Sequence, residues 1–523
     1  WTFRKKEKFF DIVTYTGNSG TSQTIAHGLN GPVGMILVKS YAGASASQNW
    51  MVFHAGNGAT KYQVLNDTTA AATATSVWND TAPTDTHFTV GSDSSVNNSN
   101  KTYIAYLFAD NSSEDADDQM IKCGTYNGTG ANQNIDLGWE AQWVLVKATI
   151  GTNSWAMFDT MRGMPTEGMD GSQRLKAESN VAETELGPAG GISAHSRGFT
   201  AKGGTGTYNQ SGNSYIYMAI RAPMMVEPEA ATDVFAAVTR NSSVGGVNYY
   251  TGFPTDLSIY NALTNTTGYA HARLTANNRL TMATTDAEIS ATAGDFGSNV
   301  GYQLGTSSTN TNAFTLNWKR AKGYMDVVCY SGTGSARTVP HSLSVVPEMI
   351  WAKCRTVGNA WCVYHSALGA TKQQLLTDAI PTTVSGNWND TEPTDSAFTV
   401  GASGKTNSNT QAQIAYLFAT LAGISKVGSF VGNGSSQTIS CGFSAGSRYI
   451  LIKRTDATGD WYVWDTTRGI VAGNDPHYSI NTSTSQVTND DSIDPANAGF
   501  IVNQVAATNI NVSSATYIFY AIA

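Results

Sequence analysis

The chain has 523 residues, enough for three or four domains of about 150 residues each. Charged residues make up only 13% and the formal net charge is −8, which argues against a basic nucleic-acid-binding surface. A hydrophobic fraction of 41% is too high for a disordered chain, yet no apolar run approaches the roughly 18 residues of a membrane helix. We therefore expect several folded domains and no membrane insertion.

In chain order, the clearest predicted elements are short strands. They are runs of β-branched and aromatic residues separated by Gly, Asn and Ser turns, as in 35–39, 50–53, 103–108, 143–147, 215–220 and 501–505. The stretch 178–185 is the best candidate for a helix, and it is brief. Many short strands in units of about 100 residues predict an all-β protein of tandem, jelly-roll-like β-sandwich modules.

The clearest repeat, module A, carries the phrase Trp-Asn-Asp-Thr-x-Pro-Thr-Asp at 78–85 and again at 388–395. Eleven of the fourteen positions that begin with these two phrases are identical. A second repeat, module B, carries a Trp-led strand followed by Asp-Thr-x-Arg-Gly, at 155–163 and 461–469. Because A and B share the order apolar strand, Lys, turn and Trp-led strand, we interpret them as distant copies of one unit.

A third segment, C, separates the two A–B pairs and also has the composition of a β-sandwich. The residues around Trp1 and Asp11 resemble those around Trp318 and Asp326, where C leads into the second A module. Allowing a two-residue length difference, we treat Trp1 and Trp318 as equivalent. The predicted order is thus (C)-A-B-C-A-B, and we expect the natural protein to continue upstream.

These repeats predict the following domain limits. Residues 1–10 are the closing strand of a preceding C module, and the later modules are A1 at 11–118, B1 at 119–223, C at 224–325, A2 at 326–422 and B2 at 423–523.

The carboxylates of the repeated phrase suggest either a turn, a ligand or ion contact, or an acid–base pair. Asx side chains followed by Thr-x-Pro are typical of turns, and this interpretation is the strongest. The two tryptophans could stack on a sugar ring, although most Trp residues here are expected in the core. The candidate glycan- or ion-contacting residues are therefore Trp78, Asp80, Asp85, Trp388, Asp390 and Asp395.

Other recurring polar residues favour structural roles. His54 and His365 end a Trp-led strand, and we expect them to form core or turn hydrogen bonds. A lysine recurs at one strand position in both A and both B modules, and the simplest account in B is an ion pair with the Asp of the next strand. These lysines are Lys39, Lys147, Lys353 and Lys453.

No credible catalytic, metal or cofactor site is predicted. The five cysteines are scattered, without zinc-like spacing, and we expect free, packed thiols. The sequence has neither a Gly-x-Ser-x-Gly motif nor a phosphate-binding Gly-rich loop.

The N-terminal phrase Trp-x-Phe-Arg-Lys-x-x-Lys-Phe-Phe-Asp-Ile-Val-Thr-Tyr-Thr-Gly, followed by Thr-Ile-Ala-His-Gly-Leu and Met-Ile-Leu-Val-Lys, resembles known repeat modules. They occur in tail-fibre and other virion-appendage proteins of tailed, often marine, bacteriophages. The resemblance implies a non-enzymatic virion protein, made in the bacterial cytoplasm, that forms a shaft and attaches to host-surface glycans. It also implies contacts with other virion proteins and a homo-oligomer, for which we expect a trimer.

Two alternatives stay open. The chain could decorate a capsid or tail as a scaffold without a receptor role. It could instead be a polysaccharide depolymerase, which would need a groove with paired carboxylates.

Overall fold

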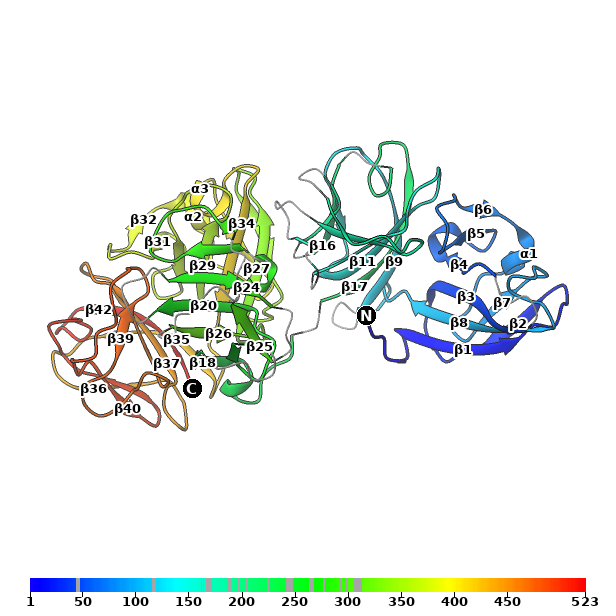
Figure 1. Cartoon of the computed structure of the whole chain (residues 1–523). Coiled ribbons are helices and arrows are strands. Elements are labelled where there is room, and N and C mark those ends of the chain that lie inside the picture. The colour runs from blue at the N-terminus through cyan, green and yellow to red at the C-terminus, as the bar shows by residue number, and fades with distance from the viewer. Residues whose placement is uncertain are drawn as a thin grey trace. The chain divides into compact units, whose positions relative to one another are not determined.

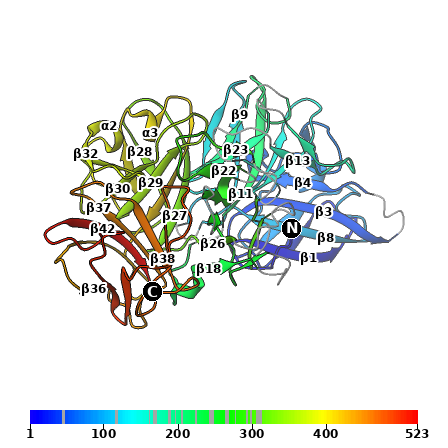
Figure 2. The ribbon, with the colours of Figure 1, turned by 60° about the vertical axis from the view of Figure 1, so that its left-hand side comes forward.

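The computed structural model describes residues 1–523 with short gaps, and its chain forms two compact units, Trp1–Met224 and Met225–Ala523 (Figure 1). The gaps in the described residues are 44–47, 115–118, 161, 163, 166–171, 187–189, 196, 204–205, 223–224, 241–247, 263–267, 276–277, 291–293, 297–299 and 305–312. Unit 1 holds modules A1 and B1, and unit 2 holds C, A2 and B2 (Figures 1 and 2).

Each module is a β-sandwich with one large and one small antiparallel sheet. In A1 the large sheet has the order β1-β8-β3-β4-β5-β6 and the small sheet pairs β2 with β7. The A1 elements are β1 (Phe10–Thr16), β2 (Gln23–Ala26), β3 (Val33–Gly43), β4 (Met51–His54), η1 (Ala55–Asn57), β5 (Lys61–Val64), β6 (Ala72–Thr73), α1 (Thr75–Trp78), β7 (His87–Val90) and β8 (Lys101–Ala109). The A2 elements are β27 (Met325–Ser331), β28 (Arg337–Pro340), β29 (Met349–Cys354), β30 (Cys362–His365), β31 (Lys372–Leu375), β32 (Thr382–Thr383), α2 (Ser385–Trp388), β33 (Ala397–Val400), α3 (Gly404–Asn407) and β34 (Ala412–Phe418).

The B modules follow the same plan with a three-stranded small sheet, β10-β16-β15 in B1 and β36-β41-β40 in B2. The B1 strands are β9 (Ile121–Asn127), β10 (Gln133–Asp136), β11 (Ala141–Ala148), β12 (Ala156–Asp159), β13 (Gln173–Lys176), β14 (Thr184–Glu185), β15 (Ile192–His195), β16 (Gly198–Ala201) and β17 (Ser214–Arg221). The B2 strands are β35 (Ser425–Val431), β36 (Gln437–Ser440), β37 (Tyr449–Arg454), β38 (Trp461–Asp465), β39 (His477–Ser479), β40 (Ile493–Ala496), β41 (Gly499–Val502) and β42 (Thr516–Ile522). The stretch 178–185, the helix candidate, forms a turn and β14 instead of a helix.

Module C has the same topology, which its sequence did not reveal. Its large sheet has the order β18-β26-β20-β21-β22-β23, and its small sheet has the order β19-β25-β24. The elements are η2 (Ala231–Asp233), β18 (Phe235–Thr239), β19 (Tyr249–Tyr250), β20 (Leu257–Ala262), β21 (Tyr269–Ala272), η3 (Arg273–Thr275), β22 (Asn278–Thr281), β23 (Ile289–Ser290), β24 (Gly294–Asp295), β25 (Gly301–Leu304) and β26 (Ala313–Trp318). The chain is therefore five copies of one sandwich.

In unit 2 the large sheets are buried on both faces. Successive residues of a strand point to opposite faces, so Ile350 packs inside the A2 sandwich while its neighbour Trp351 packs outside it. The outer faces of all three large sheets meet in one hydrophobic cluster. Its members include Leu257, Ile259 and Trp318 from C, Trp351, Trp361 and Tyr416 from A2, and Tyr449, Leu451 and Tyr520 from B2. Burial of both faces explains why these strands carry few charges.

The segment ahead of β1 repeats the segment ahead of β27. Lys6 forms a β-bridge with Phe10, and Ala321 forms the matching bridge with Met325. The two segments therefore align without a gap. The described backbone of residues 1–9 forms no strand, because the partners that flank β26 in unit 2, namely β18 and β20, have no counterpart among the described strands of unit 1.

This register corrects the equivalence of Trp1 with Trp318. Without a gap, Phe3 takes the place of Trp318. The contacts agree, because Phe3 packs edge-on against Trp143 with ring centres 6.4 Å apart, and Trp318 packs edge-on against Tyr449 at 5.5 Å. Trp143 and Tyr449 occupy the same position, since they pair with Asp159 and Asp465 on the neighbouring strands.

Candidate functional site

The repeated Trp-Asn-Asp phrase forms a helix end followed by a left-handed turn. The short helix α1 ends at Trp78, and the next two residues, Asn79 and Asp80, have φ angles of 53° and 47°. The N–H of Thr81 then donates to the carbonyl of Trp78 at 3.0 Å. Asn and Asp tolerate this left-handed conformation better than most residues, which explains their presence here. Asn389 and Asp390 have the same conformation after α2.

The two tryptophans of the phrase belong to the core. Trp78 and Trp388 are each 1% exposed, and they pack edge-on against Phe53 at 6.0 Å and Tyr364 at 5.8 Å. Neither ring face is open to solvent. The expectation that these rings stack on a sugar is therefore corrected: burial leaves no platform for a ligand.

The four carboxylates of the phrase are exposed. They are Asp80, Asp85, Asp390 and Asp395. Among the described residues, no group of three or more His, Cys, Asp or Glu side chains is placed to hold a metal ion. A contact of these carboxylates with a glycan or ion stays a prediction.

Three of the four recurring lysines bind a backbone carbonyl of a neighbouring module and not the Asp of the next strand. Lys147 of B1 donates to the carbonyl of Thr68 in A1 at 2.8 Å and to that of Asn153 in its own turn. The corresponding contacts across modules are Lys353 of A2 with Thr285 of C at 2.9 Å, and Lys453 of B2 with Asp378 of A2 at 2.9 Å. The aspartates pair instead with arginines three residues later: Asp159 with Arg162 and Asp465 with Arg468, both at 2.6 Å.

Burial changes the proton affinity of these lysines. Desolvation lowers the pKa of Lys147, Lys353 and Lys453 to about 8. Their ammonium groups face backbone carbonyls, which solvate the charge only in part.

A tryptophan accompanies each lysine. The indole N–H of Trp155 in B1 donates to the carbonyl of Val64 in A1 at 2.8 Å. The matching bonds are Trp361 of A2 to Thr281 of C at 2.8 Å, and Trp461 of B2 to Leu375 of A2 at 3.0 Å. We call each Lys and Trp pair with its two carbonyls in the preceding module a module joint. There is thus one module joint between A1 and B1, one between C and A2, and one between A2 and B2.

The joint between C and A2 also holds a buried ion pair. Arg355 of A2 contacts Glu288 of C at 2.9 Å, with the two side chains 1% and 2% exposed. Because both charges are removed from water, loss of either side chain would leave the other charge buried without a counter-charge.

The strand-ending histidine His54 also connects modules. Nδ1 of His54 accepts from the N–H of Gly56 at 3.0 Å, so Nε2 carries the proton and donates to the carbonyl of Tyr217 in B1 at 3.0 Å. Burial lowers the pKa of His54 to about 4, and that of its counterpart His365 likewise to about 4. Both imidazoles are therefore neutral at pH 7, and the prediction of core and turn hydrogen bonds is confirmed.

Sequence reasoning missed a recurring buried asparagine. Asn97 accepts from the N–H of Asn18 at 2.8 Å and donates to the carbonyl of Gly91 at 2.9 Å, which ties two loops together. Asparagines in the other A and B modules make the equivalent bonds: Asn209, Asn407 and Asn511. The signal was present in the sequence, since each precedes the closing strand residue Tyr103, Tyr215, Gln413 or Tyr517 by the same spacing.

The contact between B2 and C closes unit 2 into a ring in which each module touches the other two. The hydroxyl of Thr467 in B2 donates to the carbonyl of Ala237 in C at 2.6 Å. The guanidinium of Arg468 lies 4.7 Å from the ring centre of Phe314 in C. The ring of Tyr449 packs against Phe235 of C at 5.4 Å.

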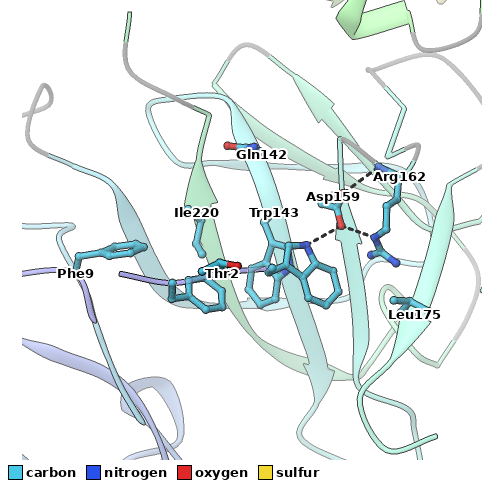
Figure 3. Close-up of a pocket in the computed structure, with 10 residues that line it drawn as sticks. Thr2, Phe9, Gln142, Trp143, Asp159, Arg162, Leu175 and Ile220 are labelled. Atoms are coloured by element: carbon cyan, nitrogen blue, oxygen red, sulfur yellow. Dashed lines mark hydrogen bonds and ion pairs between the residues drawn. The ribbon is translucent and has the colours of Figure 1, made fainter. Parts of the chain in front are cut away.

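Unit 1 has a pocket of about 580 Å³ at the N-terminal segment (Figure 3). Its residues are Trp1, Thr2, Phe3, Phe9, Gln142, Trp143, Asp159, Arg162, Leu175 and Ile220. The indole N–H of Trp1 donates to Asp159 at 2.9 Å, and Asp159 also pairs with Arg162. The guanidinium of Arg162 lies 4.6 Å from the ring centre of Trp1. We call these residues the unit 1 pocket.

In the described part of the chain, no helix has the length and apolar character needed to cross a membrane. All five cysteines are free and buried, as predicted.

Comparisons with known proteins give a family and no activity. No curated protein matches the sequence. A family model described as a domain of unknown function, DUF7483, matches residues 5–223 and 277–523, and the chain therefore belongs to that family.

Proposed function

We propose that this protein is a non-enzymatic structural segment of a bacteriophage virion, in a tail fibre or other appendage. The observation that carries the proposal is the use of the recurring side chains. Most of the recurring Lys and Trp residues, together with His54, bind a neighbouring module, and the Asn-Asp pairs form turns. A protein whose repeated polar residues hold its own modules together suits a mechanical role better than a chemical one.

A contribution to host attachment is the finer part of this proposal. The exposed carboxylates Asp80, Asp85, Asp390 and Asp395 recur on two modules and could contact a surface glycan directly or through an ion. Two weak contacts on one chain, multiplied in a homo-oligomer, would give firm attachment. Burial of the tryptophans favours a scaffold without a receptor role as the second candidate.

The test has two parts. Mass spectrometry and antibody labelling of purified particles should place the chain on a virion appendage, and its absence from particles would contradict the structural role. Binding of the purified chain to host cells and to their isolated surface polysaccharide should then be compared with a variant carrying Asp80→Asn and Asp390→Asn. Equal absence of binding in both would leave the scaffold candidate, and release of reducing sugar would contradict a non-enzymatic role.

A further inference from the structure

Unit 1 contains two modules where unit 2 contains three, so among the described residues of unit 1 no third sandwich lies against B1. In unit 2, Tyr449 of B2 is fully buried, with Phe235 of module C against its ring. In unit 1, the equivalent Trp143 is 7% exposed and lines the unit 1 pocket, with Trp1 and Phe3 against its ring. The neighbouring Ile220 is half-buried, whereas its counterpart Ile522 is fully buried.

The charged pair at the pocket repeats this difference. Arg468 and Asp465 are 4% and 0% exposed, and the ring of Phe314 from module C covers the guanidinium. The side chain of Arg162 is 26% exposed, although Arg162 makes the same ion pair. The ring over it belongs to Trp1, which is itself 59% exposed.

The A side of unit 1 lacks the same neighbour. In A2, Trp361 and Lys353 form a module joint with carbonyls of C and are buried. Their counterparts in A1, Trp50 and Lys39, are half-buried, and among the described residues Lys39 donates to Gln48 within its own module.

The outer face of the A1 sheet is therefore built as in A2 but only partly covered. Trp50 stacks on Tyr106 at 5.8 Å, as Trp361 stacks on Tyr416 at 6.1 Å. Tyr416 is 1% exposed, whereas Tyr106 is half-buried. An apolar face prepared for contact and left partly open marks an interaction surface.

We propose that the unit 1 pocket and the outer face of the A1 sheet around Trp50 together bind a third β-sandwich of the type of module C. This module would belong to the same chain and lie directly ahead of Trp1. The seated module would cover Trp143 and Arg162 with apolar side chains at the positions of Phe235 and Phe314. It would also supply to Trp50 and Lys39 the carbonyls that Thr281 and Thr285 supply in unit 2.

Two observations favour a module in cis over a second copy of this chain. The gapless register already puts Phe3 in the place of Trp318, the last residue of β26. The closing strand of such a module would thus run directly into residues 1–9. The matching face of module C in a second copy is occupied, since Leu257 and Trp318 are fully buried within its own unit 2.

The test extends the full chain with a copy of residues 225–315 directly ahead of Trp1, so that Trp1 takes the place of Leu316. Hydrogen–deuterium exchange then compares the extended and unextended chains. We expect exchange in β4, β11 and β12 to slow by about tenfold or more, to the level of β30, β37 and β38. The matched control carries Phe→Asp at the copies of positions 235 and 314, and it should give no added protection.

Three outcomes would overturn the proposal. One is a folded extension, shown by slow exchange in its own strands, that leaves β11 and β12 unchanged. If the extension does not fold, the same test is repeated on a chain with Trp143→Tyr and Met157→Val, which give B1 the residues that contact C in B2. The second outcome is that the extension gives no added protection to β11 and β12 in this variant either. The third is protection of the unextended chain that rises with its concentration, which would assign the seat to a second copy.

Discussion

Trp155 of module B1 donates its indole N–H to the carbonyl of Val64 in module A1 across 2.8 Å, and both residues are buried. The same bond joins A2 to C and B2 to A2. The repeated tryptophan therefore acts between modules as well as within one.

Replacement of this donor should weaken unit 1. Trp155→Phe keeps most of the apolar area but leaves a buried carbonyl with one partner fewer, so we expect a loss of about 1–3 kcal/mol in the free energy of unfolding. Urea titration followed by circular dichroism measures it. The matched control is Trp50→Phe, because the indole N–H of Trp50 donates to no other module in the described chain. Equal losses in the two variants would contradict the joint.

The joint lysines should make stability depend on pH. Burial lowers the pKa of Lys353 and Lys453 to about 8, against about 10.4 in an unfolded chain. Between these values the unfolded state binds more protons, so the lysines make stability rise with pH from about 8 to about 10 and contribute no slope below 8. The difference in unfolding free energy between the natural chain and Lys353→Met with Lys453→Met should therefore change over this range in favour of the natural chain. Parallel pH profiles from denaturant titrations would contradict this account.

The buried ion pair between C and A2 should respond asymmetrically to substitution. Arg355→Met leaves Glu288 buried without its partner, and we expect a loss of about 3–5 kcal/mol in the unfolding free energy of unit 2. Arg355→Met combined with Glu288→Leu should recover most of it. The control is Arg454→Met, whose pairing with the exposed Asp456 should contribute about 0–1 kcal/mol. A double variant as unstable as the single one would contradict the explanation.

Substitutions at Asp80 distinguish a structural role of this residue in its left-handed turn from a chemical role of its carboxylate. Asp80→Val forces a β-branched residue into a φ of 47°, and we expect a loss of about 1–2 kcal/mol, while Asp80→Gly should leave stability unchanged or raise it. Asp85→Val at the neighbouring exposed position should cost less than about 0.5 kcal/mol. Thermal unfolding monitored by calorimetry measures all three, and equal effects of Val at both positions would contradict the turn.

The sequence was sufficient to predict the sandwich fold and the A and B repeats, because their Trp, Lys and Asp residues recur in the same order. It also predicted a β-sandwich for module C, but not that C repeats the topology of A, because the sheet of C carries Leu257 and Ile259 where A2 carries Met349 and Trp351, and Gly268 where A2 carries Trp361. The topology of C depends on alternating burial, which many different apolar residues satisfy.

The role of the lysines was mispredicted for a related reason. Their partners across the joints are backbone carbonyls, and the residues that supply them are Thr68, Thr285 and Asp378. A carbonyl is the same in every residue type, so an acceptor in another module leaves no side-chain signature. In the sequence, the aspartate of the next strand was the evident partner for the lysine. In the structure this aspartate forms an ion pair with an arginine.

The bond from Thr467 to Ala237 joins residues 230 positions apart. Such a contact forms only after the chain from 237 to 467 has been synthesised, so the ring of unit 2 closes last during translation. Until then the parts of the outer faces of C and A2 that B2 covers stay in water, and partly assembled chains with exposed apolar surface are prone to aggregate. We therefore expect unit 2 to refold slowly, because this long-range contact must form before its three modules are all joined.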